Sequence, residues 1–198
     1  MVFLRSPFSP DLPPVLGAGP VRLRVPQVSD FESWAAVRLE SRTFLAPWEP
    51  SWPSDDITRS AFRSRIKRYM RDIEDDLAYP FFLTRSDDNA LLGALTISNV
   101  RRGVAQMASL GYWIGRSFAR QGYMTAAVHA VLPFVFDHLR LHRLEAACLP
   151  ANLASIRLLK RCGFSEEGRA RRYLKINGKW EDHLLFGLLA SDRVDDRD

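Results

Sequence analysis

The residues best suited to chemistry lie in the stretch 110–128, LGYWIGRSFARQGYMTAAV. A strand-like segment ends there at Gly115, and a short loop leads to Gly122, directly before a long helix-patterned segment. Unpaired N–H groups and the positive end of the helix dipole attract anions to such a start. Gly122 lets the backbone approach a ligand without a Cβ, and Arg116 and Arg120 can add charge-assisted bonds. The loop therefore suits a phosphate group, although it carries neither GxxxxGK[ST] nor GxGxxG, and a strand–Gly–helix turn is also an ordinary connection.

A second helix start follows some thirty residues later. Asn152 comes shortly after Pro150 at the end of a strand-like run, and Ser155 lies three residues further on. Asn is a preferred N-cap residue, and Gly163 is suited to end the helix, so capping alone explains these residue types. The pairing with the first loop is the unusual point, because two neighbouring strands would each end at a polar or glycine-bearing helix start.

The elements that position these residues follow from hydrophobic spacing. Strands are predicted over 21–27, 80–86, 90–100, 104–115, 143–150, 164–176 and 182–189. Helices are predicted over 31–42, 55–78, 121–140 and 152–162, the third with a kink at Pro133. This order predicts a mixed α/β (α+β) fold around one sheet. We expect residues 1–20 to form an extended Pro-rich arm, 21–190 a single domain, and 191–198 a polar tail.

Composition excludes several classes of protein. The 198 residues are 46% hydrophobic and 26% charged, which is typical of a globular domain and excludes collagen-like and disordered chains. No apolar run has the length of a membrane span, and prolines interrupt the N-terminal segment before it could serve as a signal peptide. Cys148 and Cys162 form neither a disulfide framework nor a metal quartet, and we expect both to be buried packing residues. These observations predict a cytoplasmic protein without a metal.

The net charge of +5 does not identify a partner. Arginine supplies all but four of the 28 basic residues, which suits a phosphate-rich ligand but equally fits a source genome that favours arginine codons. No DNA-binding pattern is present. Arg101, Arg102, Arg169, Arg171 and Arg172 would suit ribosomal RNA, but aromatic residues are not interleaved with them.

The sequence resembles the GNAT N-acetyltransferases over about residues 21–190. IGRSFARQGYM looks like their acyl-CoA pyrophosphate loop, and NLASIRLLKRCGF looks like their Asn-containing helix that ends in Gly-Phe. Within the family the RimJ/RimL group, which acetylates N-termini of ribosomal proteins, is most similar. FLAPWEP, LGYWIG, RCGF and YLKINGKWEDH carry that likeness.

The resemblance implies binding of acetyl-CoA between two splayed parallel strands. Backbone groups of Trp113, Ile114 and Arg116 would pair with the pantetheine arm, and Asn152 would hydrogen-bond it. The pyrophosphate would be wrapped by the amides of the next segment, with Arg120 on the approach. That segment comprises Gln121, Gly122, Tyr123, Met124 and Thr125.

The chain departs from the family pattern at several positions. Ala119 stands at the first position of the loop pattern, where the family has Arg or Gln. Met124 stands at the last position, where the family has Gly or Ala. Leu159 stands where many relatives carry a tyrosine acid, and the resemblance implies that Ser155 does this work instead. Ser109 stands where such enzymes place a glutamate base, so that base is missing.

Without that base, an N-terminal acceptor is the better match. An α-amine of pKa about 7.8 is roughly 14% neutral at pH 7, whereas a lysine of pKa about 10.4 is below about 0.1% neutral. Glu49, in the loop that contains Phe44, Trp48 and Trp52, is the candidate carboxylate, or it binds the substrate ammonium, or it is only a loop residue. Those aromatic residues would wall a peptide groove or form a separate hydrophobic cluster.

Other polar side chains are weaker candidates for a catalytic or metal-binding role. Tyr173 is a further possible proton donor, or an ordinary strand tyrosine. Asp182 and His183, adjacent on a strand, point to opposite faces and form no dyad. His129, His138 and His142 lack metal-ligand spacing.

The expected function is acetyl-CoA-dependent transfer to the α-amine of a ribosomal or other protein, of alanine type. The alternatives are a small-molecule amine acetyltransferase, for an antibiotic, polyamine or amino acid, and a non-catalytic acetyl-CoA-binding module. A monomer and a homodimer are both compatible with the sequence.

Overall fold

A computed structural model describes residues 12–192 and contains one eight-stranded sheet of order β1-β2-β3-β4-β5-β6-β8-β7. The strands are β1 (Leu16–Ala18), β2 (Val21–Arg24), β3 (Tyr79–Arg85), β4 (Leu91–Arg101), β5 (Met107–Ile114), β6 (Arg143–Cys148), β7 (Ser165–Ile176) and β8 (Lys179–Leu189). All neighbouring strands pair antiparallel except β5 and β6, which are parallel. The helices are α1 (Phe31–Glu40), α2 (Arg42–Leu45), α3 (Arg59–Glu74), α4 (Tyr123–Pro133) and α5 (Leu153–Arg161). This confirms the predicted mixed α/β fold.

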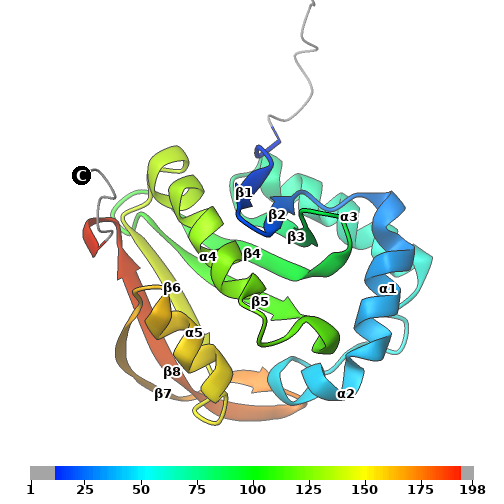
Figure 1. Cartoon of the computed structure of the whole chain (residues 1–198). Helices are drawn as coiled ribbons and strands as arrows, with labels where there is room; N and C mark the ends of the chain where they lie inside the picture. Colours follow the sequence, from blue (N-terminus) through cyan, green and yellow to red (C-terminus); the bar gives the residue numbers. More distant parts are fainter. Residues whose placement is uncertain (1–11, 193–198) are drawn as a thin grey trace, which may run out of the picture.

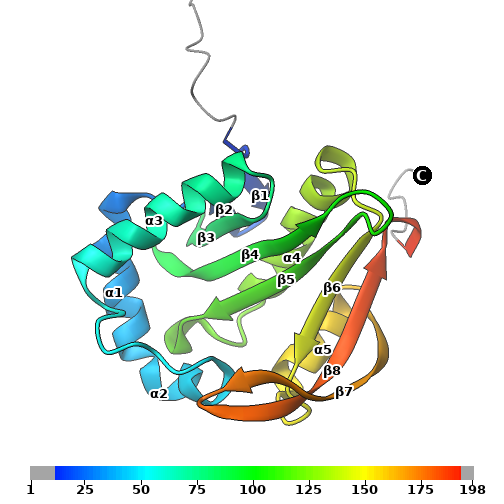
Figure 2. The same cartoon turned by 180° about the vertical axis from the view of Figure 1, so that it is seen from behind.

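Helices cover the two faces of the sheet unequally. On one face, α4 and α5 lie over the sheet (Figure 1), and the larger core fills the space between them. Tyr112 and Ile114 of β5 pack against this core, whereas Trp113 packs against a smaller cluster around Trp34 and Phe62 on the opposite face. Figure 2 shows that opposite face, with α3 over β3 and β4 and, in the described part of the chain, no helix over β6 and β8. An open surface therefore remains beside the parallel pair.

The parallel pair separates after only three residues. Met107, Ala108 and Ser109 of β5 pair with Arg143, Leu144 and Glu145 of β6. Beyond Ser109 the two strands diverge, β5 continuing to Ile114 and β6 to Cys148 (Figures 1 and 2). Within residues 12–192, backbone groups on the facing edges of the diverging segments thus lack strand partners, which is the arrangement that the resemblance implied for the thioester site.

Several boundaries differ from the sequence-based expectation. Residues 16–18, expected within the extended arm, form the edge strand β1, which pairs with β2. The helix expected over 55–78 begins only after Thr58, whose hydroxyl accepts a hydrogen bond from the amide of Ala61 and so caps it. The helix expected over 121–140 is α-helical to Pro133 and continues as a π-helix over Phe134–His138, so the disturbance at this proline is a change of helical register. Most of the expected arm and residues 193–198 of the expected tail lie outside the described residues.

Candidate functional site

The loop between β5 and α4 is fastened to helix α1. The amide of Arg116 donates to Oγ of the buried Ser41, 2.9 Å away, and the Ser117 hydroxyl donates to Glu40. Further along, the Gln121 side chain donates to the carbonyl of Ser117 at 2.8 Å. These bonds hold the loop in a fixed shape against the C-terminal end of α1.

The start of α4 has the geometry of an anion site. Gly122 is its N-cap residue, with φ +83°, and makes no side-chain capping bond. A Cβ built on Gly122 would meet nothing within 4 Å, so the space outside the helix start is open. The side chains of Arg116 and Arg120 are exposed beside it, while Met124 is buried beneath. The helix α4 thus begins at Gly122 beside open space, with the exposed side chains of Arg116 and Arg120 close by in the chain.

The start of α5 carries the second set of predicted residues. Oδ1 of Asn152 accepts a hydrogen bond from the amide of Ser155 at 3.1 Å, which confirms the predicted cap. The Ser155 side chain lies beside Tyr112 of β5, since a hydrogen bond between them acts on the tyrosine. Burial raises the pKa of Tyr112 well above its usual range, and the bond with Ser155 offsets part of that rise. The structure thus brings Ser155 to the strand that forms one wall of the diverging pair.

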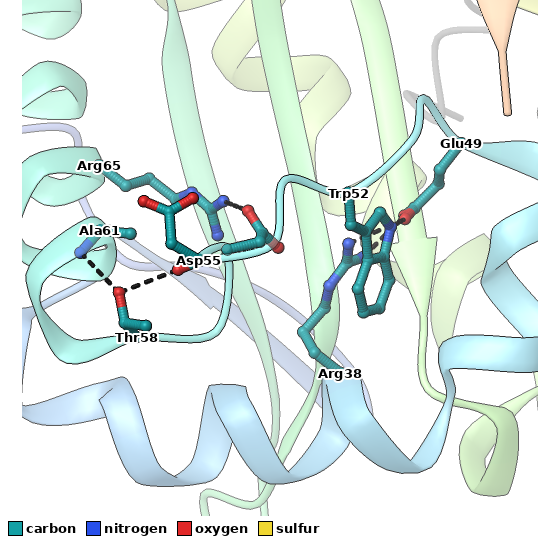
Figure 3. A network of polar contacts seen from close by, with 8 residues as sticks. Arg38, Glu49, Trp52, Asp55, Thr58, Ala61 and Arg65 are labelled. Carbon is teal, nitrogen blue, oxygen red and sulfur yellow. Dashed lines mark hydrogen bonds and ion pairs between the residues drawn. The ribbon is translucent and has the colours of Figure 1, made fainter. Parts of the chain in front are cut away.

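Glu49 forms a largely buried ion pair with Arg38. Its two carboxylate oxygens accept hydrogen bonds from Nη1 and Nη2 of Arg38 at 2.8 Å, and Oε2 also accepts one from Nε1 of Trp52 at 2.8 Å (Figure 3). The Arg38 guanidinium lies over the ring of Trp52, 3.9 Å from its centroid, and 4.9 Å from that of Trp113. The side chains of Arg38 and Glu49 are only 9% and 18% exposed. This arrangement fixes the loop at residues 46–52 onto α1 and leaves Glu49 poorly placed to accept a substrate proton.

The same loop continues into the start of α3. The Thr58 hydroxyl caps α3 and also donates to the carbonyl oxygen of Asp55 (Figure 3). The Arg65 guanidinium pairs with the carboxylate of Asp56. Loop residues 46–58 are therefore anchored at both ends, by Arg38 on α1 and by Arg65 on α3.

The turn between β7 and β8 contacts this loop from the other side. The amide of Asn177 donates to the carbonyl oxygen of Glu49 at 2.9 Å. A hollow of about 190 Å³ lies at this contact, lined in part by Arg42, Trp52 and Asn177. The β7–β8 hairpin and the loop thus meet across the end of the open surface beside β5 and β6.

Tyr173 lies on the irregular part of β7. It is 48% exposed and makes an edge-on ring contact with the buried His183, with ring centroids 5.9 Å apart. Nδ1 of His183 lies 3.0 Å from the carbonyl oxygen of Glu181, whereas Asp182 is bonded to the side chain of Arg169 and to the amide of Arg172. Asp182 and His183 accordingly have separate partners and form no dyad, as predicted.

Three residues of this region were not predicted from the sequence: Arg38, Ser41 and Tyr112. Arg38 on α1 and Ser41, the residue that follows α1, are buried polar residues, and no local pattern distinguishes them from exposed ones. Tyr112 lies within the segment LGYWIG, but nothing in that segment indicates that Ser155 of α5 lies beside it.

Two classes of site find no support among the described residues. Residues 12–192 contain no group of three or more His, Cys, Asp or Glu side chains that could hold a metal ion. In the same range, none of the helices combines the length and the apolar character that crossing a membrane requires. Cys148 and Cys162 are buried free thiols, as predicted, and burial raises the pKa of each to about 11.

Comparison with known proteins agrees with this geometry. The family model described as acetyltransferase (GNAT) domain matches residues 21–165. The chain is 36% identical to the probable N-acetyltransferase YjcK of Bacillus subtilis, over 87% of this chain and 95% of the relative. It is 35% identical to the ribosomal protein uS5 alanine N-acetyltransferase of Escherichia coli, over 86% of this chain and 89% of the relative.

A solved structure shows the same arrangement of elements. Mycobacterium smegmatis RimJ, in complex with CoA-disulfide, superposes with a TM-score of 0.84 and is 34% identical, covering 92% of this chain and 89% of its own. The diverging parallel strands, the uncapped helix start beside them and the extent of these matches lead to one conclusion. The chain belongs to the GNAT acetyltransferase family, with relatives in the RimJ/RimL group, and is an N-acetyltransferase.

Proposed function

We propose that the protein transfers the acetyl group of acetyl-CoA to the N-terminal α-amine of a protein, most readily one that begins with alanine. One observation carries the proposal: β5 and β6 diverge after Ser109 and Glu145, between the open start of α4 and the Ser155 side chain. The space between the diverging segments of β5 and β6, called the slot below, would hold an extended thioester, with an anion site at one end and a hydroxyl beside it.

The edge of β5 suits the pantetheine arm. The amide of Gly115 donates to the carbonyl of Leu92 on β4 at 2.8 Å. Because successive residues of a strand direct their backbone groups to alternate sides, Trp113 also faces β4, while Tyr112 and Ile114 face the slot. We therefore assign pantetheine pairing to Tyr112 and Ile114. The amide of Arg116 is bonded to Ser41, and the Trp113 side chain contacts Arg38, so both have other roles.

The start of α4 suits the pyrophosphate. The first amides of an α-helix have no partner within the helix, and a phosphate placed at the start of α4 would meet no side chain at Gly122. The residues assigned to this role are Gln121, Gly122, Tyr123, Met124 and Thr125, with Arg116 and Arg120 adding charge. Asn152 holds the start of α5 through its Oδ1, and its amide nitrogen is the group available to a pantetheine carbonyl.

The chemistry is direct aminolysis of the thioester. The neutral amine attacks the acetyl carbonyl carbon, the C–S bond breaks, and the sulfur takes a proton. Ser155 is the donor that we assign, because its side chain lies at the wall of the slot beside Tyr112. Tyr173 is farther along the β7–β8 hairpin, against His183, and we assign it to the acceptor side of the site.

The acceptor follows from the amine chemistry and from the relatives. At pH 7, deprotonating an α-ammonium group costs about 3.5 kcal/mol less than deprotonating a lysine. This difference favours N-terminal acceptors when position 109 supplies no carboxylate. The relative from Escherichia coli is named for alanine acetylation of ribosomal protein uS5. A ribosomal acceptor would place the reaction in the cytoplasm.

The direct test is release of CoA thiol from acetyl-CoA with two peptides of a ribosomal-protein N-terminus. One begins with free alanine, and the other is N-terminally blocked and contains a lysine. Release with the free N-terminus alone supports the proposal. Release with the blocked peptide would refute the N-terminal acceptor, and no release with either would move the activity to small amines or leave a cofactor-binding module.

A further inference from the structure

A carboxylate stands beside the position where the expected glutamate base is missing. Ser109 on β5 and Glu145 on β6 are register partners, the last pair before the two strands diverge. Side chains of register partners on adjacent strands point to the same face of a sheet. Glu145 therefore lies next to Ser109, on the same face and at the closed end of the slot.

That face is the open one. Leu144, Ala146 and Cys148 of β6 belong to the core beneath α4 and α5, so Glu145, between them, points to the opposite side. Figure 2 shows this side of β6 and β8 without a helix over it. The Ser155 hydroxyl contacts Tyr112, whose ring packs into the α4–α5 core. An amine that approaches from the open face would thus meet Glu145 on its own side, and the leaving sulfur would meet Ser155 on the other.

The Glu145 carboxylate is held in place and still accessible. Nε of Arg143 donates to its Oε1 at 2.8 Å, and within residues 12–192 its second oxygen accepts no hydrogen bond. Its side chain is 38% exposed, which allows proton exchange with water.

Arg143 is shared between two carboxylates. The Arg143 guanidinium also pairs with Glu167 of β7, so that one cation faces two carboxylates. Gly187 on β8 makes room for them: a Cβ there would lie 2.5 Å from both Nη2 of Arg143 and Oε1 of Glu167. Arg143 therefore keeps one carboxylate partner when either Glu145 or Glu167 is replaced.

We propose that Glu145 is the residue that takes a proton from the acceptor's ammonium group, an assignment that rests on the function proposed above. The ammonium gives one proton to the carboxylate, which releases it to water, and the neutral nitrogen forms the C–N bond. As the C–S bond breaks, Ser155 gives its proton to sulfur and regains one, through water, from the nitrogen. The products are one amide, one thiol and one released proton.

The test compares three variants of the full chain with the wild type, using the free-alanine peptide between pH 6 and 9. Glu145→Gln removes the base, and Glu167→Gln, which loses a carboxylate bound to the same arginine, is the matched control. The double variant Ser109→Glu/Glu145→Gln restores a carboxylate on the same face, one strand away. CoA binding by each variant is measured separately, by calorimetry.

For Glu145→Gln we expect turnover at pH 7 to fall about 100-fold with unchanged CoA binding. The loss should shrink as the pH passes the α-amine pKa of about 7.8, because a neutral amine no longer needs the base. Glu167→Gln should stay within about threefold of the wild type, and the double variant should recover at least about tenfold relative to Glu145→Gln.

Other outcomes overturn the assignment. Turnover of Glu145→Gln within threefold of an active wild type would remove Glu145 from the reaction and leave the proposed function standing. Equal losses in Glu145→Gln and Glu167→Gln that do not change with pH would make the cluster structural. A wild type that acetylates neither peptide would remove the proposed function, and the role of Glu145 with it.

Discussion

Replacing Glu49 with Gln separates a structural role of this residue from a catalytic one. The change keeps the length of the side chain and one oxygen acceptor for Trp52, but it removes the charge that pairs with Arg38. The Arg38 side chain is 9% exposed in the wild type, so the guanidinium would stay between the rings of Trp52 and Trp113 without a counter-ion. If Glu49 fixes the loop, its loss should be visible chiefly in stability.

The magnitude follows from the burial of the pair. Removing one partner of a buried ion pair costs about 3–5 kcal/mol, and the two indole faces retain about 1–2 kcal/mol through cation–π attraction. We therefore expect the free energy of unfolding to fall by about 2–3 kcal/mol. For a domain of this size the melting temperature should drop by about 4–12 °C. Turnover measured well below the new melting temperature should fall less than about tenfold.

Thermal unfolding and CoA release, measured on the same preparations, provide the assay. Glu32→Gln is the matched control, because its ion pair with Arg59 is exposed and should leave the melting temperature within about 1 °C. The double variant Arg38→Met/Glu49→Gln should lose less stability than the two single changes added together, since no unpaired buried charge remains. An unchanged melting temperature in Glu49→Gln together with a 100-fold loss of turnover would refute this reasoning and make Glu49 the base.

Further predictions concern the slot and the core. Ser155→Ala should lower turnover by about 10²-fold while CoA binds as before, and unchanged turnover would exclude the serine as proton donor. Asn152→Ala should destabilise the protein by about 1 kcal/mol in urea denaturation, because it removes the cap of α5; no change would show that the cap is dispensable. Gly122→Val should weaken CoA binding by at least tenfold in calorimetry, because a β-branched residue is strained at φ +83° and fills the open cradle; wild-type affinity would exclude this helix start as the phosphate site. Cys148 and Cys162 should resist a thiol reagent at pH 8 in the folded state, since the pKa of each is raised to about 11, and rapid labelling at pH 8 would contradict their burial. The free energy of unfolding should decrease as the pH rises from about 8.5 to 11, because the folded state keeps these two protons to a higher pH than the unfolded state does.

Local patterns predicted most of the fold. Hydrophobic spacing predicted the central strands, and the last two strands, expected over 164–176 and 182–189, are observed as Ser165–Ile176 and Lys179–Leu189. The edge strand Leu16–Ala18 was missed because three residues next to glycine and proline carry no periodic signal, and its pairing with β2 is a tertiary contact. The predicted strand at 104–115 begins only at Met107, where pairing with β4 and β6 becomes possible.

The site could be predicted only where its residues lie close together in the sequence. The open start of α4 and the cap at Asn152 depend on residues close in sequence, and both were predicted. The occupation of Glu49 by Arg38 could not be predicted, because no spacing rule links a residue on a helix with one in the following loop. For the same reason, Glu145 was not predicted as the neighbour of Ser109. Their proximity depends on the register of two strands separated by the whole of α4.

The central claim is that the acetyl group goes to an N-terminal α-amine. The most direct measurement incubates the protein with acetyl-CoA and a single peptide that carries both a free N-terminal alanine and an internal lysine, and locates the acetyl group by fragment-ion mass spectrometry. We expect an added acetyl group on the first residue alone. Acetylation of the lysine, with the N-terminus left free, would contradict it.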